Sequence, residues 1–174
     1  KNSLINSSLN LSSIDNNADT VDVGWVQCDL CGKWRTLPSH INSESLPDNL
    51  RKRAIHIIGE NDRVWRGMTA LHQNDLIAFG QLMFASHESS SHDFGNRCRE
   101  LDILVTCAKS IPGCLGGRLM GGGFGGCTIN LVRTDYVDSF CKQLIIAYRE
   151  KTGIETEAFV VSAADGAIGG ELHR

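Results

Sequence analysis

The chain lacks the features that mark several broad classes of protein. None of its apolar runs approaches the roughly 20 residues needed to span a bilayer, which excludes an integral membrane protein. Residues 1–20 contain no apolar segment of the kind that a secretory signal requires. A formal net charge of −3 argues against broad nucleic-acid binding, which needs a basic surface. We therefore expect neither a membrane nor a nucleic acid as a partner.

A disulfide framework is also absent from the pattern. The seven cysteines are odd in number and unevenly spaced, and no secretory signal accompanies them. We interpret them as reduced thiols of an intracellular, cytoplasmic protein.

Composition divides the chain into three parts. Ten of the first 20 residues are Ser or Asn, which predicts a disordered tail over residues 1–20. The first 50 residues carry three basic and six acidic side chains, whereas the rest carries 14 of each, so the net charge lies entirely in the first 50. We predict a short Trp- and Cys-containing segment over residues 21–50 and a compact domain over residues 51–174.

Apolar periodicity predicts the elements of this compact domain. Helices are expected over 51–73, from residue 76 with Asn74 as its cap, near 98–110, and after Thr134 as a cap. Alternation predicts strands over 115–120, 127–133 and 156–161. The helical stripes are interpreted as core; they are Ile57, Val64, Met68 and Leu71; Leu76, Phe79 and Met83; Leu101, Leu104, Val105 and Ala108; and Val137, Phe140, Cys141, Leu144, Ile145 and Tyr148. This order predicts an α+β fold, with helices on one face of a small sheet.

Glycine is concentrated in one place. Eight of the 18 glycines lie between Gly113 and Gly126, and five of them fall within the six residues 121–126. Such a run costs backbone entropy, so it indicates positive φ angles or close approach of a ligand to the backbone. A structural hairpin loop and a nest of amides that binds phosphate both remain open. A dinucleotide fold is rejected because a strand-like stretch follows the glycines, and no Gly-Lys-Ser/Thr triplet is present for a P-loop.

Together with its flanks, the glycine run resembles a known motif. The sequence GRLM followed by GGGFGGCTINLV is similar to the third signature motif of galactokinases, in the GHMP sugar-kinase superfamily. The stretches RAIHIIGENDRV, DLIAFGQLMFASH and SAADGA are similar to the C-terminal half of the same family, so the resemblance covers about residues 51–171. It implies the GHMP-kinase C-terminal fold, a ferredoxin-like layer of helices on a small antiparallel sheet.

The resemblance also implies a function. Galactokinases transfer the γ-phosphoryl group of ATP to the C1 hydroxyl of a galactose-type sugar with Mg²⁺, by positioning and charge neutralisation. A role at the nucleotide phosphates carries over to Gly121, Gly122, Gly123, Gly125 and Gly126. The family's phosphate loop and its catalytic Asp and Arg lie in an N-terminal half that has no counterpart here. We therefore expect no galactokinase activity from this chain alone.

The segment before residue 51 resembles a different family. Cys28 and Cys31 form a C-x-x-C knuckle that presents two thiolates to one Zn²⁺. With its flanks, the stretch at about residues 21–49 is similar to the first half of a CW-type zinc finger, a module that reads methylated lysine on histone tails. Trp25 and Trp34 correspond to the aromatic cage of that family, which attracts a quaternary ammonium group. The family's third and fourth cysteines have no counterpart, so the predicted site holds half of its ligands.

Three interpretations of the whole chain follow. In the first, it is a galactokinase-type C-terminal half that carries part of an ATP site. In the second, it is a chromatin-reading zinc module with a passenger domain, which would place it in the nucleus. In the third, it is a junction of two truncated coding segments with no retained activity.

A few single residues also receive predictions. Cys107, Cys127 and Cys141 are expected to be buried, and His87 is attributed to packing. Residues 89–91, a Ser triplet, are interpreted as a solvated helix end. Arg118 is open to two roles, a charge for phosphate or a structural ion pair.

Overall fold

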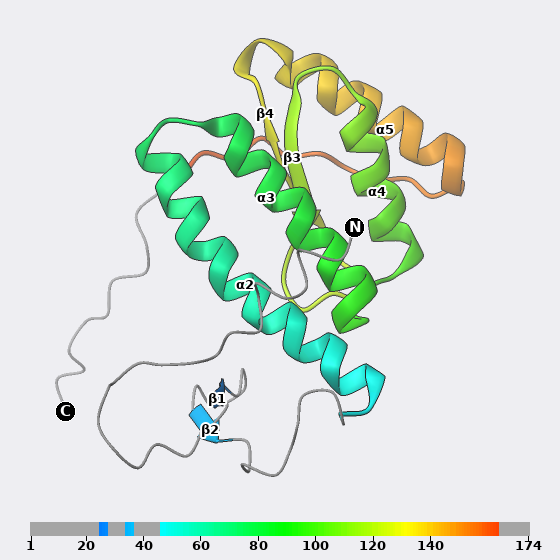
Figure 1. Ribbon diagram of the computed structural model, residues 1–174. Coiled ribbons are helices and arrows are strands. Elements are labelled where there is room, and N and C mark those ends of the chain that lie inside the picture. The colour runs from blue at the N-terminus through cyan, green and yellow to red at the C-terminus, as the bar shows by residue number, and fades with distance from the viewer. Residues whose placement is uncertain (1–24, 28–33, 37–45, 164–174) are drawn as a thin grey trace, which may run out of the picture. The chain divides into compact units, whose positions relative to one another are not determined.

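A computed structural model describes residues 25–27, 34–36 and 46–163 of the chain (Figure 1). The predicted tail at 1–20 and the cysteines Cys28 and Cys31 lie outside these residues. The chain divides into two compact units, Lys1–Gly59 and Glu60–Arg174, and the division falls inside one helix. No helix in the described part is long and apolar enough to cross a membrane.

The first unit contains a short antiparallel hairpin and the start of a helix. Strands β1 (Trp25–Gln27) and β2 (Trp34–Thr36) pair so that Trp25 lies opposite Thr36 and Gln27 opposite Trp34. Helix α2 (Asp48–His72) begins with an acidic residue in its first turn, as the helix dipole favours.

The second unit is built on a two-stranded antiparallel sheet. Its order after α2 is α3 (Leu76–Ser89), a π-helical turn (Ser90–Phe94), α4 (Arg99–Ser110), β3 (Cys114–Leu119), β4 (Thr128–Val132), a 3₁₀ turn (Thr134–Tyr136) and α5 (Val137–Thr152). Helices α3 and α4 pack against β3, and α5 packs against α4 (Figure 1). The predicted α+β class, with helices on a small antiparallel sheet, is confirmed.

Helices α4 and α5 supply most of the core. Their inward stripes meet the end of β3, where Leu119 is 1% exposed. The cluster is purely apolar, and burial of such surface is the main stabilising term of a small domain; it consists of Leu101, Leu104, Cys107, Ala108, Ile111, Leu119, Phe140, Leu144 and Tyr148. The core stripes predicted for these two helices are therefore confirmed.

Helix α3 touches β3 backbone to backbone. A Cβ atom built on Gly80 would lie 2.0 Å from the carbonyl oxygen of Leu115, and one on Gly116 would lie 2.5 Å from the Cα of Gly80. Only glycine permits this approach at both positions. The contact fixes the height of α3 over the strand that leads into the glycine loop.

The prediction that α2 carries a core stripe is wrong in the second unit. Val64, Met68 and Leu71 are 60%, 47% and 51% exposed. Gly67 and Ala70 are buried instead, on the adjacent face of the helix, and a Cβ on Gly67 would lie 3.3 Å from the ring of Phe79. Periodicity identified an apolar stripe correctly, but what packs against the helix is decided by tertiary context.

Three smaller expectations also need correction. Asp75 caps α3, since its carboxylate accepts the Ala78 amide at 2.9 Å, whereas Asn74 takes a left-handed φ of 55°. Thr134 begins the 3₁₀ turn, and α5 starts three residues later. Residues 156–161 form no strand. They line one groove with β4 and α5, but their backbone has no strand partner among the described residues.

Candidate functional site: a glycine loop held by Asn96

The glycine run is the connection of the β3–β4 hairpin. The amide of Met120 donates to the carbonyl of Cys127 at 3.0 Å, which closes the loop at its base. Five residues inside it have φ between 60° and 144°, a region that costs strain for any side chain but is open to glycine; they are Gly121, Gly123, Phe124, Gly125 and Gly126. The glycine run therefore forms a hairpin loop, as one of the two interpretations predicted, and phosphate binding stays a prediction.

Asn96 anchors the middle of this loop. Its side-chain amide donates to the carbonyl of Gly122 at 3.0 Å, and its backbone carbonyl accepts the amide of Phe124 at 2.8 Å. A Cβ on Gly123 would lie 2.3 Å from that same carbonyl. Gly123 is thus required by packing, and Asn96, which is buried, sets the position of the loop.

The other four glycines face open space. A Cβ atom on Gly121, Gly122, Gly125 or Gly126 would meet no atom within 4 Å. Packing within the described structure does not require glycine at Gly122, whose φ is also not positive. An exposed backbone of this kind can present its amides to an anion, as nests of successive amides do. At these four positions the backbone of the loop is therefore open to its surroundings.

A buried polar chain supports the strand that enters the loop. The amide of Leu119 donates to Nδ1 of His87 at 3.2 Å, and Nε2 of His87 lies 3.3 Å from Oδ1 of Asp102. Ser91 donates to the same carboxylate oxygen at 2.7 Å. Because Nδ1 accepts a bond, the neutral ring carries its proton on Nε2, facing Asp102. This chain joins α3, α4 and β3 at the end nearest the glycines.

Burial favours the neutral form of His87. Desolvation lowers the pKa of His87 below its ordinary value, and the nearby Asp102 carboxylate opposes this only in part.

The interpretation of the Ser triplet as a solvated helix end is wrong, because Ser89, Ser90 and Ser91 are 9%, 2% and 7% exposed. Ser89 ends α3, and Ser90 and Ser91 begin the π-helical turn. Serine contributes nothing to an apolar pattern, so the sequence did not predict that these residues are buried.

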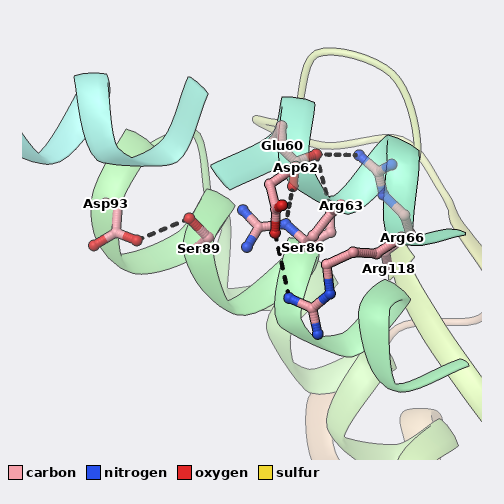
Figure 2. Close-up of polar contacts among 8 residues, drawn as sticks. All are labelled: Glu60, Asp62, Arg63, Arg66, Ser86, Ser89, Asp93 and Arg118. Atoms are coloured by element: carbon pink, nitrogen blue, oxygen red, sulfur yellow. Dashed lines mark hydrogen bonds and ion pairs between the residues drawn. The ribbon is translucent and has the colours of Figure 1, made fainter. Parts of the chain in front are cut away.

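A second polar cluster surrounds Glu60 on α2. Figure 2 shows Arg63, Ser86 and Arg118 gathered on its carboxylate, at 2.6, 2.8 and 3.7 Å. Partial burial acts to raise the pKa of Glu60, but the bonds from Arg63 and Ser86 outweigh it, so the pKa lies below its usual value. Of the two roles open to Arg118, the structure contains the ion pair.

The remaining predicted site residues divide between the described and undescribed parts. Trp25 and Trp34 lie on the paired strands β1 and β2, at the two sides of the connection 28–33 that contains Cys28 and Cys31. Cys107 is fully buried, as predicted, and Cys141 is only half-buried. The prediction that Cys127 is buried is wrong, because this residue follows the open loop and is exposed. Within the described residues, no group of three His, Cys, Asp or Glu side chains is placed to hold a metal ion.

Sequence reasoning missed the residues that hold the loop. Glu60, His87 and Asp102 all fall in stretches that resemble the family, but only the structure shows what they bind. In the sequence, nothing indicates that Asn96 holds the loop except that it follows a glycine. In the structure, that glycine, Gly95, has a left-handed φ of 81°.

Comparison with known proteins identifies the class of the second unit. Residues 68–150 match the GHMP kinases C-terminal family, and residues 24–51 match the CW-type zinc finger family. The C-terminal part of the chain is therefore similar to the GHMP-kinase C-terminal domain.

Within that class, the C-terminal part is similar to galactokinases. It is 42% identical over 125 residues to galactokinase of Roseiflexus sp. (strain RS-1), covering 72% of this chain and 32% of the relative. It is 43% identical over 121 residues to galactokinase of Chloroflexus aurantiacus, covering 70% and 31%. A crystal structure of Lactococcus lactis galactokinase complexed with galactose matches with a TM-score of 0.61 and 36% identity, over 66% of this chain and 32% of that one. The chain thus spans about a third of the length of these relatives.

Proposed function

We propose that residues 51–174 contribute the glycine-rich wall of an ATP site in a galactokinase-like sugar kinase. The observation that carries this proposal is the loop at 121–126, in which Asn96 fixes one glycine while four others leave the backbone open. Its amides would bind phosphate oxygens of ATP, with Gly121, Gly122, Gly123, Gly125 and Gly126 as the binding residues.

In the complete enzyme, this wall would position the nucleotide for transfer of its γ-phosphoryl group to the C1 hydroxyl of a galactose-type sugar. Mg²⁺ would neutralise charge on the phosphates when bound. The ligands for that ion are expected in the part of the kinase that this chain does not span. We therefore propose that the chain alone does not phosphorylate galactose, and that a soluble cytoplasmic kinase is the setting in which its domain works.

Binding of a non-hydrolysable ATP analogue to the purified chain tests the loop. Gly122→Val is the sharpest variant, because this position has open space and no positive φ, so the side chain obstructs the ligand without straining the fold. We expect calorimetry to show at least about a 10-fold loss of affinity, or about 1.4 kcal/mol. Ile146→Val, an exposed change on α5, is the control and should bind as the parent does. Equal affinity of the Gly122 variant and the parent would remove the loop from the nucleotide site.

Activity is tested separately. The purified chain with ATP, Mg²⁺ and galactose should form no galactose 1-phosphate above a blank. Turnover by this chain would show that the catalytic groups are present within it.

A second function is supported by the CW-type match at residues 24–51 and by the β1–β2 pairing. We propose that Cys28 and Cys31 supply two of the four ligands that a structural Zn²⁺ needs. Trp25 and Trp34 would then form a cage for methylated lysine, a role that would require nuclear access. Zinc content near one equivalent in the parent, and near zero in Cys28→Ser, would support the metal site. A trimethyl-lysine peptide that binds the parent but not Trp34→Ala would support the cage.

A further inference from the structure

Helix α2 presents its apolar side to solvent within the second unit. Val64, Met68 and Leu71 recur at intervals of four and three residues, which places them on one face of the helix; we term them the α2 stripe. All three are about half exposed or more, and the neighbouring Trp65 is 69% exposed. Contiguous exposed apolar side chains are a feature of surfaces that bind another polypeptide, a membrane or a ligand.

The packed side of the same helix is polar or small. There the Glu60 carboxylate accepts hydrogen bonds from Ser86 and Arg63, and Gly67 and Ala70 allow α3 to approach. The helix is therefore already anchored to α3 through contacts that do not use its large apolar residues. Its strongest hydrophobic face is left for a different partner.

The relatives indicate which partner this is. A match of 125 residues within a chain of 174 must include residues 50–125, so it includes the α2 stripe. That match accounts for only 32% of the Roseiflexus galactokinase. Helix α2 thus belongs to a fold that occurs in a polypeptide about three times as long as the matched part. The remainder of that polypeptide is available to cover the stripe, and this chain does not span it.

We infer that the α2 stripe is the docking surface for the remainder of a galactokinase-type kinase, the part outside the region matched by this chain. This inference rests on the proposed function and extends it to an interface. Docking there would remove the exposed parts of three aliphatic side chains and an indole from water, which is the dominant favourable term in most protein association. The same contact would bring the glycine loop to the part of the kinase that holds the catalytic groups.

Co-expression tests this interface. The full 174-residue chain, carrying an affinity tag, is produced with the segment of Roseiflexus galactokinase that lies outside the match. We expect a 1:1 complex by light scattering, and we expect the double variant Val64→Asp/Met68→Asp to bind at least about 100-fold more weakly. Ile146→Asp is the matched control, since it introduces the same charge at a site on α5 that is 49% exposed, and it should retain the complex. Equal binding by the double variant and the parent would overturn the inference.

A second measurement does not depend on that segment folding alone. Residues 51–174 replace the matched third of Roseiflexus galactokinase, and thermal unfolding of this chimera is compared with that of the chain. The double variant should lower Tm by more than about 5 °C in the chimera and by less than about 1 °C in the chain, where the stripe is exposed. Equal shifts in both backgrounds would overturn the inference. So would a dimer of the chain that the double variant dissolves, since the occupant would then be a second copy.

Failure of this interface and failure of the proposed function are distinguishable. Gly122→Val should leave the complex intact while it weakens the ATP analogue. A complex that forms through the stripe but binds no analogue would remove the nucleotide role and keep the interface.

Discussion

At the scale of single residues, one glycine of the loop differs from its neighbours. Gly123 combines a φ of 82° with a Cβ position only 2.3 Å from the carbonyl of Asn96. Gly123→Ala should therefore lower the free energy of unfolding by about 1–3 kcal/mol, because the loop must leave its anchor and strain is added. Gly122→Ala is the control in open space and should change it by less than about 0.5 kcal/mol. Urea unfolding of the two variants checks this, and similar losses in both would contradict the anchoring role of Asn96.

His87 makes stability depend on pH. Its pKa in the folded chain lies below the ordinary value of 6.5, chiefly because of burial, so the unfolded chain takes up the proton first as the pH falls. This contribution is complete above about pH 6.5 and is lost progressively below it. The urea midpoint of unfolding should decrease when the pH is lowered from 7.5 to 5.5. It should decrease less in His87→Gln.

The Gln variant retains an acceptor for the Leu119 amide, so its remaining pH dependence reports the other titrating groups. A parent and variant with the same slope over this range would show that His87 does not titrate with folding. The Glu60 carboxylate, whose pKa is depressed, contributes in a separate window: its stabilisation is present above about pH 4.5 and is lost below it.

At the scale of elements, α3 and β3 approach each other backbone to backbone. Gly80→Ala places a methyl group 2.0 Å from the carbonyl oxygen of Leu115, which is backbone and cannot rotate away. We expect a loss of about 2–3 kcal/mol, at the upper end for an overpacked core site. Gly67→Ala is the matched control on α2, where the neighbour is the edge of the Phe79 ring at 3.3 Å and a helix gains about 1 kcal/mol from Ala over Gly. Thermal unfolding should therefore separate the two variants clearly, and a tolerated Gly80→Ala would contradict the backbone contact.

Sequence periodicity was sufficient where an element has its partner in the chain. The stripes of α4 and α5 pack on one another and on Leu119, and both were predictable. The stripe of α2 was equally periodic, yet it lies exposed, because periodicity identifies an apolar face without identifying what covers it. The strand predicted at residues 156–161 is wrong for the same reason. Alternation indicates an extended segment, but a strand exists only with a hydrogen-bonded neighbour.

The candidate site was predictable at the level of its glycines alone. A run of five glycines in six residues has few explanations. The sequence therefore locates the loop and limits its role to a structural hairpin or a phosphate-binding nest. The residues that hold it act over long separations, 26 residues for Asn96 to Gly122 and 32 for His87 to Leu119. No local pattern encodes such pairs, and a buried Asn or His has no periodicity that distinguishes it from a surface residue.

At the scale of the whole molecule, the chain matches two different families along its length. The match to the zinc finger family ends at residue 51, and the match to the kinase family begins at residue 68, so α2 connects them as one continuous helix. Any metal dependence should therefore be confined to residues 21–50, whereas the kinase-like domain should be held by its apolar core.

Metal removal tests this division of stability. A chelator should shift the main thermal transition, followed by far-ultraviolet circular dichroism, by less than about 1 °C, and Cys28→Ser should do the same. The physical reason is that the cluster around Leu101 and Phe140 is apolar, and residues 46–163 offer no set of three side chains placed as metal ligands. The core variant Leu104→Ala is the positive control, since loss of a buried Leu side chain costs about 2–5 kcal/mol and must lower the same transition. A chelator effect as large as that of Leu104→Ala would mean that the zinc segment and the kinase-like domain unfold together, and that α2 couples them energetically.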